Sequence, residues 1–455
     1  YQPEREGVCR GLNTQRPTSH DASTDLLFFN PLLAYRVMRS VFVNLGPLVS
    51  FRHAHGPNHE NAIEPAGMGI VVKDGQITRI EESSVLREEF SIPNEVHPVV
   101  GDTLCFDLQH RPVVPGLIDA HTHLLWAGDR SREISLRREG KTYAEIASLG
   151  GGIQYSVEQT RSATDDQLHS LGYQRLREAL NMGTTHLEAK SGYGLSVESE
   201  LRLLEVAERL NGNAHTPTID HTWMGAHDVP KGQTTDEYVE SVISDQLPAI
   251  VEQDIARSAD VFCEPGWFSV EQSETILQAS RKAGLDLRMH VDEFADGGGG
   301  SLASELRVQT ADHAYHTPLD VRLNMKDSGV NTGFLPGTPY AMGDAWPNMG
   351  EIHEHAIPFT LASDFNPNCR TLSLPFMCSL MVQRCNMHPL HALAAVSTNA
   401  AKTTPHPSGL PHGVIAEGAA ANFNIIDGEH WESMVLRPSS SPFSATVLNG
   451  QFIAH

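Results

Sequence analysis

The sequence predicts an α/β fold, in which a (β/α)8 TIM-like barrel is joined to a small β-sandwich domain built from both chain termini. Three observations predict it. Short β-like runs fill the first part of the chain and return at its end. Between them, apolar strand candidates alternate with amphipathic helical stretches over roughly 290 residues, a usual size for such a barrel. Residue types suited to chemistry close these strands, at the ends where barrel enzymes carry their active sites.

We expect a polar extension at 1–24, a composite β domain at 25–112 plus 410–455, and a catalytic barrel at 113–409. The extension has no apolar region of the kind found in a signal peptide. The expected β-runs of the composite domain are DLLFFN, GMGIVVKDGQITRIEE, VGDTLCFDL, GLPHGVIAEGAAANFNIID and FSATVLNGQFIAH.

Two connections in the composite domain have a clear local pattern. Lys73-Asp74-Gly75 predicts a tight turn between two strands. The segment FRHAHGPNHENAIEPAG contains three histidines, but its Gly, Pro and Asn residues are typical of a solvated loop. We therefore interpret it as a loop and not as a metal site.

The barrel is predicted from eight apolar runs with helical stretches between them. Three of these stretches, SVESELRLLEVAERLNG, TDEYVESVISDQLPAIVEQDIARS and SVEQSETILQASRKAG, have the helical period. The strand candidates are LIDAHTH, TTHLEAK, TIDHTWMGAH, DVFCEP, LDLRMHVDE, QTADHAY, GVNTGFLP and PFTLASD.

Composition excludes several classes of partner. A formal net charge of −23 repels phosphates, which argues against nucleic acid and anionic membranes. The chain has no run of about 18 apolar residues that could span a membrane. Six cysteines without a CxxC pair indicate free thiols in a reducing compartment, so we expect a cytoplasmic enzyme. A homodimer is the default expectation for such an enzyme.

Two histidines stand two residues apart in the first barrel strand candidate. Side chains at i and i+2 of an extended strand share a face, so His121 and His123 can reach one metal ion. Satisfied core histidines would give the same motif, and His227, Glu264 or His313 singly also have structural explanations. Their joint occurrence at the ends of the strands favours a site. The strand-ending residues are His121, His123, Lys190, Tyr193, His227, Glu264, His290, Glu293, His313 and Asp364.

The expected metal ligands are His121, His123, His290 and Asp364. This mixed nitrogen and oxygen set suits a zinc ion, and iron is also compatible. Water on such an ion loses a proton near neutral pH, which provides a hydroxide for hydrolysis of an unreactive C–N bond. No GxSxG, GxxxxGK[ST] or GxGxxG motif offers a different chemistry.

Glu293 follows His290 by three residues in HVDEF, so the two would lie on opposite faces of a straight strand. Both can serve one site only if the chain turns just after His290. The GGGG run at 297–300 then supplies a flexible connector or a close backbone approach to a ligand.

With these residues in place, the chain resembles the amidohydrolase superfamily and, within it, the imidazolonepropionase family. Members of that family open the ring of 4-imidazolone-5-propanoate to N-formimidoyl-L-glutamate in histidine degradation. The resemblance runs from about residue 25 to the end of the sequence. Its motifs are HTHLLWAGDR, GGGI, KSGYGL, GAH, DVFCE, HVDEF, ADH, LPGT and SDFNP, in this order.

The resemblance implies one metal ion on the four ligands named above and a substrate site around them. The residues that it implies for the substrate are Arg130, Tyr193, His227, Glu293 and Asn366. Arg130 fits the carboxylate of a small anionic heterocycle, because a guanidinium can pair with it in a bidentate manner.

Our hypothesis for the reaction is attack of the metal-activated water on the ring carbonyl. His227 and the metal would stabilise the oxyanion, Glu293 would bind the ring, and either Asp364 or His313 would transfer the proton to the departing nitrogen.

Two departures from the family pattern concern the substrate site. Asn368 and Cys369 follow SDFNP where many relatives have Gly and then Thr or Ser, so backbone contacts to substrate differ there. The GGGG run is longer than the usual pair. Lys190 occupies a KSGYGL setting, which indicates a structural or substrate-loop role and not the carbamylated lysine of two-metal relatives.

Two other functions fit part of the pattern. A related metal-dependent deaminase of a nitrogen heterocycle would share the ligands, but it would release ammonia and have no need of Arg130 and Tyr193. A catalytically inactive barrel retained as a binding protein would not need intact ligands. Metal content and turnover separate these possibilities.

Overall fold

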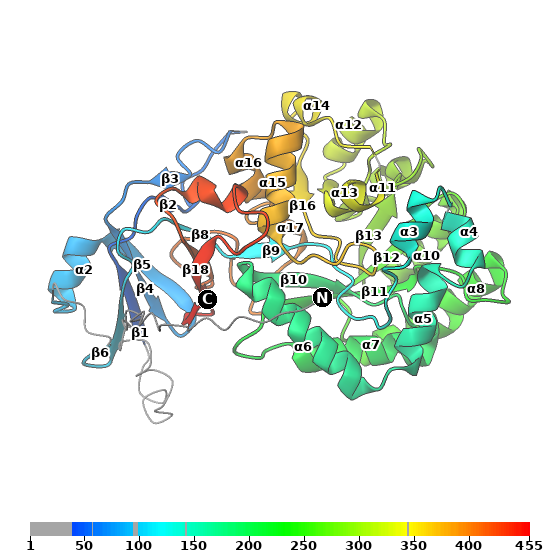
Figure 1. The fold of residues 1–455 in the computed structure, drawn as a ribbon, viewed down its shortest axis with the longest axis horizontal. Coiled ribbons are helices and arrows are strands. Elements are labelled where there is room, and N and C mark those ends of the chain that lie inside the picture. Colours follow the sequence, from blue (N-terminus) through cyan, green and yellow to red (C-terminus); the bar gives the residue numbers. More distant parts are fainter. Residues whose placement is uncertain (1–38, 57, 94–98, 142, 344) are drawn as a thin grey trace, which may run out of the picture.

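The computed structural model describes residues 39–56, 58–93, 99–141, 143–343 and 345–455. The predicted extension at 1–24 and the β-run DLLFFN lie outside these ranges. Figure 1 shows a barrel with helices around it and a smaller β-rich part at one side. In the described part of the chain, no helix combines the length and the apolarity needed to cross a membrane.

The eight predicted barrel strands are confirmed and pair in chain order as a parallel sheet. The first and last strands meet just beyond their ends, through a parallel bridge between Thr122 and Phe365. His123 N–H donates to Phe365 O at 2.9 Å, and Asp364 N–H donates to His121 O at 3.2 Å. The segments that close the barrel therefore carry three of the expected metal ligands. The strands are β9 (Leu117–Asp119), β10 (Thr184–Lys190), β11 (Thr218–Ala226), β12 (Ser258–Cys263), β13 (Asp286–Val291), β14 (Thr310–His313), β15 (Asn331–Phe334) and β16 (Phe359–Leu361).

The predicted helices are also present, and one is interrupted. In the stretch 235–258, a five-residue π-helix, η1, separates two α-helices. Pro248 at the start of the second helix has no N–H to donate to the preceding turn, which favours the altered winding. The helices around the barrel are α3 (Glu133–Arg138), α4 (Tyr143–Ser148), α5 (Gly152–Ser162), α6 (Asp165–Asn181), α7 (Val197–Leu210), α8 (Thr235–Ser241), η1 (Val242–Gln246), α9 (Leu247–Gln253), α10 (Val270–Lys282), α11 (Gly299–Leu306), α12 (Leu319–Asp327), α13 (Gly337–Met342), α14 (Met349–Glu354), α15 (Leu374–Cys385), α16 (Pro389–Ala395) and α17 (Ala400–Thr403).

Residues from both termini form two further sheets, as expected. One has the order β5-β4-β1-β7-β6 and the other β19-β18-β17-β8-β2-β3. Strand β8 pairs with β17 and β2, so the barrel strands begin at Leu117 and the expected domain limit at residue 113 is too early. The elements are β1 (Arg39–Val43), β2 (Leu48–Val49), β3 (Ile63–Glu64), β4 (Met68–Lys73), β5 (Gln76–Glu82), α2 (Ser83–Glu89), β6 (Val99–Val100), β7 (Thr103–Asp107), β8 (Val113–Pro115), β17 (Phe423–Ile426), η2 (Trp431–Val435), β18 (Phe443–Leu448) and β19 (Gln451–Ala454).

The two sheets pack face to face through aromatic side chains. Phe42 of β1 is fully buried, stacks on Phe106 with ring centroids 4.9 Å apart, and meets the edge of Phe423 from the other sheet at 5.1 Å. The predicted turn at Asp74–Gly75 joins β4 to β5, and both residues have positive φ, as a two-residue hairpin turn requires.

A cluster of three buried histidines joins the amino end of β10 to the segment after α17. The rings of His186, His406 and His412 lie 5.1 to 5.5 Å apart in all three pairs. Burial and the neighbouring imidazoles lower the pKa of His186 and that of His412, the latter to about 4. For His406, burial is the cause. The folded chain therefore keeps these rings neutral.

This cluster makes folding stability depend on pH. A histidine pKa below its unfolded value of about 6.5 means that the unfolded chain binds more protons, so stability is present above that pH and is lost as pH falls. Between about pH 7 and pH 5, we expect the free energy of unfolding to fall less steeply for His412→Gln than for the wild type. The difference between the two slopes is up to ~1.4 kcal/mol per pH unit.

Denaturant unfolding at several pH values measures this slope. The matched control is His430→Gln, because His430 is exposed. It should retain the wild-type slope. An H412Q slope equal to that of the wild type would contradict the prediction.

Candidate active site

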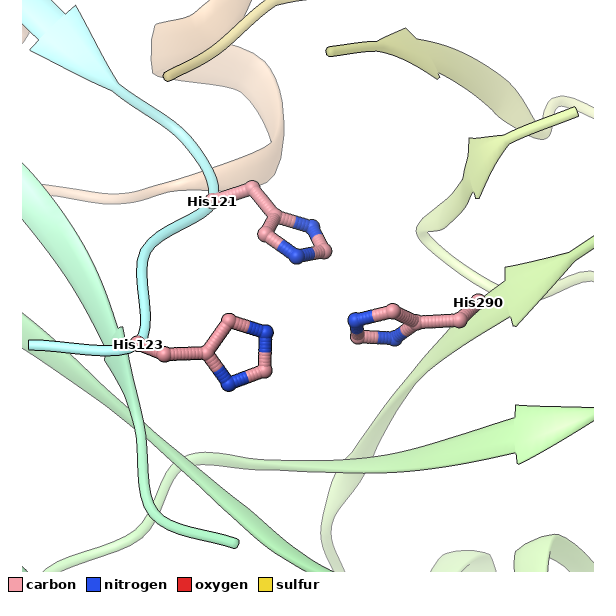
Figure 2. A group of neighbouring side chains, drawn as sticks. All are labelled: His121, His123 and His290. Atoms are coloured by element: carbon pink, nitrogen blue, oxygen red, sulfur yellow. The ribbon is translucent and has the colours of Figure 1, made fainter. Parts of the chain in front are cut away.

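Three histidine side chains meet at the carboxyl end of the barrel. His121 and His123 follow β9, and His290 lies near the end of β13. Figure 2 shows the three rings around one point, each with a nitrogen directed toward it. Their ligand nitrogens lie within 4.8 Å of one another, and all three residues are buried. A second group that meets the same limit contains His121, His313 and Asp364.

The hydrogen bonds of these imidazoles fit a metal ion. His121 Nδ1 lies 2.7 Å from Asp312 Oδ2, and His290 Nδ1 lies 2.9 Å from Asp260 Oδ1. An ionised carboxylate only accepts, so each Nδ1–H donates and each Nε2 keeps its lone pair. Both Nε2 atoms are buried without a hydrogen-bond partner. Two unpartnered lone pairs directed at the same point are what a metal ion needs.

Asp364 completes this donor set. Its Oδ1 lies 3.5 Å from His121 Nε2 and 3.8 Å from His123 Nε2, and its Oδ2 accepts a hydrogen bond from Thr338 Oγ1 at 2.7 Å. Asp364 has a φ of 48°, in the left-handed region that residues with a side chain rarely adopt. Such backbone strain persists where the surrounding structure enforces it, and here the barrel closure does so.

Burial controls the charge states in this region. It lowers the pKa of His121, His123 and His313 well below 6.5, assisted by neighbouring cationic groups. Burial also raises the pKa of Asp312, to about 6. For Asp260, the opposing effects of His290 and Lys190 outweigh burial and lower the pKa. Neutral imidazoles with ionised partners are the forms that metal ligation requires.

Above these ligands lies a cleft of about 630 Å³. The structure brings almost all of the sequence-predicted site residues to its walls, and His121 lies buried below. The predicted residues on the walls are His123, Arg130, Tyr193, His227, His290, Glu293, His313, Asp364, Asn366, Asn368 and Cys369.

Arg130 is buried in the wall of the cleft, and Glu133 holds it in place. Its Nε and Nη2 donate to the two carboxylate oxygens of Glu133 at 2.7 and 2.8 Å. The bidentate pairing that we expected with substrate is thus made with Glu133. Glu133 Oε1 also accepts Gly152 N–H at 2.9 Å, and a Cβ on Gly151 would lie 2.8 Å from that oxygen. The GGGI motif therefore lets α5 begin against this ion pair.

His227 has a fixed tautomer. Its Nδ1 lies 2.9 Å from Gly192 O, and since a carbonyl only accepts, this nitrogen carries the proton. Burial, together with His290, lowers the pKa of His227 to about 3. Its Nε2 is then an acceptor, which does not fit the oxyanion-donor role expected from the sequence.

The departures at Asn368 and Cys369 form a local turn. Asn366 Oδ1 accepts the backbone N–H of Asn368 at 2.7 Å and that of Cys369 at 3.2 Å. Asn368 Oδ1 accepts from Arg137 Nη1 at 3.2 Å. Burial raises the pKa of the Cys369 thiol to about 12, so the thiol stays protonated. These backbone donors bind Asn366 and are not directed at a substrate.

Two strand-ending residues have supporting positions outside the walls of the cleft. Glu264 accepts the backbone N–H of Glu293, and burial raises its pKa to about 7. Lys190 lies fully buried between Glu188 and Asp260.

Sequence reasoning missed two groups. The first is an aromatic wall, in which Trp267 lies 4.8 Å from Phe262 and 5.9 Å from Phe294 between ring centroids. Apolar residues in these positions look like core residues in a sequence. The second comprises the histidine partners Asp260 and Asp312, and here a signal was present, because each is an acidic residue within a predicted barrel strand.

Comparisons with known proteins agree with this geometry. The model of the amidohydrolase family matches residues 113–452. An imidazolonepropionase of Solibacter usitatus is 36% identical over 91% of this chain and 98% of its own. An imidazolonepropionase of Haloarcula marismortui is 37% identical over 78% of this chain and 83% of its own. An imidazolonepropionase of Shewanella frigidimarina is 35% identical over 85% of this chain and 92% of its own.

Solved structures share the fold at low identity. A 5-methylcytosine deaminase from Klebsiella pneumoniae aligns with a TM-score of 0.66 and 16% identity, over 91% of this chain and 98% of that one. An ochratoxinase from A. niger aligns with a TM-score of 0.64 and 15% identity, over 92% and 96%. At these identities the likeness concerns the fold alone.

Metal analysis of the purified protein tests the donor set. We expect His290→Ala to lower the bound metal on the order of tenfold or more, because it removes an expected ligand nitrogen. His391→Ala is the control, since His391 is half-buried beside His353 and His59 and outside the cleft. It should keep the wild-type content, and metal loss in H391A alone would contradict this assignment.

Proposed function

The chain belongs to the amidohydrolase family and, within it, to the imidazolonepropionases, and from this premise we propose how its site carries out the reaction. The reaction is the hydrolytic ring opening of 4-imidazolone-5-propanoate to N-formimidoyl-L-glutamate in histidine degradation. One observation carries the proposed roles. The unpartnered Nε2 atoms of His121 and His290 lie at the base of a cleft whose wall contains a buried arginine.

We propose that His121, His123, His290 and Asp364 hold a zinc or iron ion. When bound, the ion acts as a Lewis acid that lowers the pKa of water from about 15.7 to near 7 and polarises a carbonyl. The fit rests on the neutral imidazoles of His121 and His123, on the Nδ1 atoms of His121 and His290 held by aspartates, and on a carboxylate oxygen beside them.

Arg130 binds the propionate of the substrate in this proposal. Glu133 occupies the Nε–Nη2 edge of the guanidinium, so the substrate carboxylate approaches from another edge. The ion pair fixes the plane of the guanidinium before substrate arrives, and less side-chain entropy is then lost on binding. Tyr193 contributes an O–H donor, and Asn366 also lines the cleft.

His227 and Glu293 orient the heterocycle. Because His227 Nδ1–H donates to Gly192 O, its Nε2 can accept an N–H of the imidazolone ring. Its ring stacks on that of His123 with centroids 4.9 Å apart, which places it beside the reacting centre. Glu293 Oε2 lies 3.6 Å from His313 Nε2. The Glu293 carboxylate accepts a second N–H of the imidazolone ring. Two acceptors favour a substrate that presents N–H groups.

Asp364 accepts the proton of the attacking water. Its Oδ1 is close to the imidazole set, whereas Thr338 engages Oδ2. His313, in one group with His121 and Asp364, then receives this proton from Asp364 and passes it to the departing ring nitrogen. The carboxylate and the imidazole thus divide acceptance and delivery of the proton between them.

The partner that we propose is a small anionic heterocycle. With a net charge of −23, the chain repels nucleic acid and anionic membranes, and a local cation must capture an anionic substrate. The buried Arg130 meets that requirement. A heterocycle deaminase remains the second candidate, because such an enzyme shares the fold.

Product analysis tests the reaction. Purified protein of known metal content is incubated with 4-imidazolone-5-propanoate, while ring absorbance, formimidoylglutamate and ammonia are followed in one tube. We expect ring loss with formimidoylglutamate and without ammonia. Stoichiometric ammonia would identify a deaminase instead.

Arg130→Met tests the carboxylate clamp. Loss of a hydrogen bond to a charged group predicts a fall in kcat/KM of about 10- to 100-fold, mainly through KM. Arg132→Met is the matched control, because Arg132 is an exposed arginine of the same loop. If both variants keep wild-type kinetics, another residue binds the carboxylate.

A further inference from the structure

A buried ammonium lies directly beneath the metal ligands, and the proposed reaction does not use it. Lys190 ends β10, and its side chain is completely inaccessible to solvent. Its Nζ donates to Glu188 Oε1 at 2.8 Å and to Asp260 Oδ2 at 2.7 Å. Lys190 is not among the residues that line the cleft, so it acts through these two carboxylates.

The first carboxylate leads to the His121–His123 pair. Glu188 Oε2 accepts the backbone N–H of Thr122 at 3.2 Å, and Glu188 O accepts the Thr122 hydroxyl at 2.7 Å. The backbone N–H of Lys190 donates to Thr122 O at 2.9 Å. Thr122 stands between the two histidines, so these bonds fix the direction in which both rings leave the chain.

The second carboxylate leads to His290. Asp260 uses Oδ2 for Lys190 and Oδ1 for His290 Nδ1, at 2.9 Å. This bond keeps the proton on Nδ1 and directs the Nε2 lone pair toward the site. One ammonium therefore connects the segment after β9 with β10, β12 and β13 through two carboxylates.

We propose that Lys190 is a positioning residue for the metal site, which holds His121, His123 and His290 in register by clamping Glu188 and Asp260. The proposal rests on the metal site of the proposed function. Without the ammonium, two buried carboxylates would face each other without a cation between them. Their repulsion would be strong, because both lie in a low-dielectric interior. They would move apart and carry the partners of Thr122 and His290 with them.

The charge on Lys190 is consistent with this role. Burial alone would lower its pKa, but Asp260 and Glu188 outweigh burial and raise it. The ammonium form is thus the form that the folded chain contains. A neutral side chain of similar length keeps the packing of Lys190 and removes only the clamp, which makes Lys190→Met the informative variant.

Metal binding tests the proposal. Metal-free wild type and Lys190→Met are titrated with Zn²⁺ against a chelator and, separately, with Co²⁺, whose visible spectrum reports the ligand arrangement. We expect K190M to bind Zn²⁺ about 10- to 100-fold more weakly and to give an altered Co²⁺ spectrum, as is usual when the partners of ligands are disturbed.

Arg257→Met is the matched control. It breaks the ion pairs of Arg257 with the buried Asp220 and the exposed Asp286 at the amino end of the barrel, so it removes charge pairing away from the site. Its Zn²⁺ affinity and Co²⁺ spectrum should equal those of the wild type. Wild-type metal affinity in folded K190M would overturn the proposal.

Glu188→Gln covers the case in which K190M does not fold. It keeps the bond from Lys190 to Asp260 but weakens the ion pair with Lys190 and the connection to Thr122, so we expect a smaller loss of Zn²⁺ affinity. Unchanged affinity in E188Q would then overturn the proposal. A wild type that binds no metal would refute the metal site itself, and one that binds metal without opening the ring would refute only the proposed function.

Discussion

The rest of the structure depends on how the barrel closes. Strands β9 and β16 meet beyond their ends, through Thr122 and Phe365, and three neighbours of these two residues, His121, His123 and Asp364, are proposed metal ligands. The backbone hydrogen bonds that close the barrel therefore also set the positions of the proposed ligands. An aromatic support lies behind them, where Arg175 stacks 4.0 Å over Trp126 and 5.3 Å over Phe365, and donates to Leu124 O at 2.7 Å. A shift in this support would move the ligands of both segments.

Burial has opposite consequences for the two kinds of charge around the site. Imidazoles lose their protons when buried, which makes them ligands, while carboxylates stay ionised only where a cation or a hydrogen-bond donor compensates them. Asp260 is compensated by Lys190 and His290, and Glu133 by Arg130. Each buried acid named here thus fixes the direction of one functional side chain.

The sequence predicted the position of the chemistry better than the contacts of individual groups. Strand period and strand-ending residues place His123, His290 and Asp364 in one cleft, because parallel strands bring their carboxyl ends together. The bidentate use of Arg130 by Glu133 depends on side-chain rotamers, and the tautomer of His227 depends on the carbonyl of Gly192, 35 residues away. The predicted start of the barrel domain at residue 113 is too early, because the apolar run of β8 is compatible with either sheet by its sequence pattern.

The guanidinium of Arg130 shows why orientation matters more than charge in this cleft. Arg137, on α3 like Glu133, binds Asn368 at the mouth, so more than one cation lies near the substrate path. Of these two arginines, Arg130 is buried and is held in a plane by a carboxylate that also accepts the first N–H of α5. A flexible cation would attract any anion, whereas a fixed guanidinium rewards a carboxylate at one distance from the reacting carbonyl. In the proposed reaction, the distance from the guanidinium of Arg130, which Glu133 orients, to the imidazoles at the base of the barrel therefore selects the length of the propionate chain.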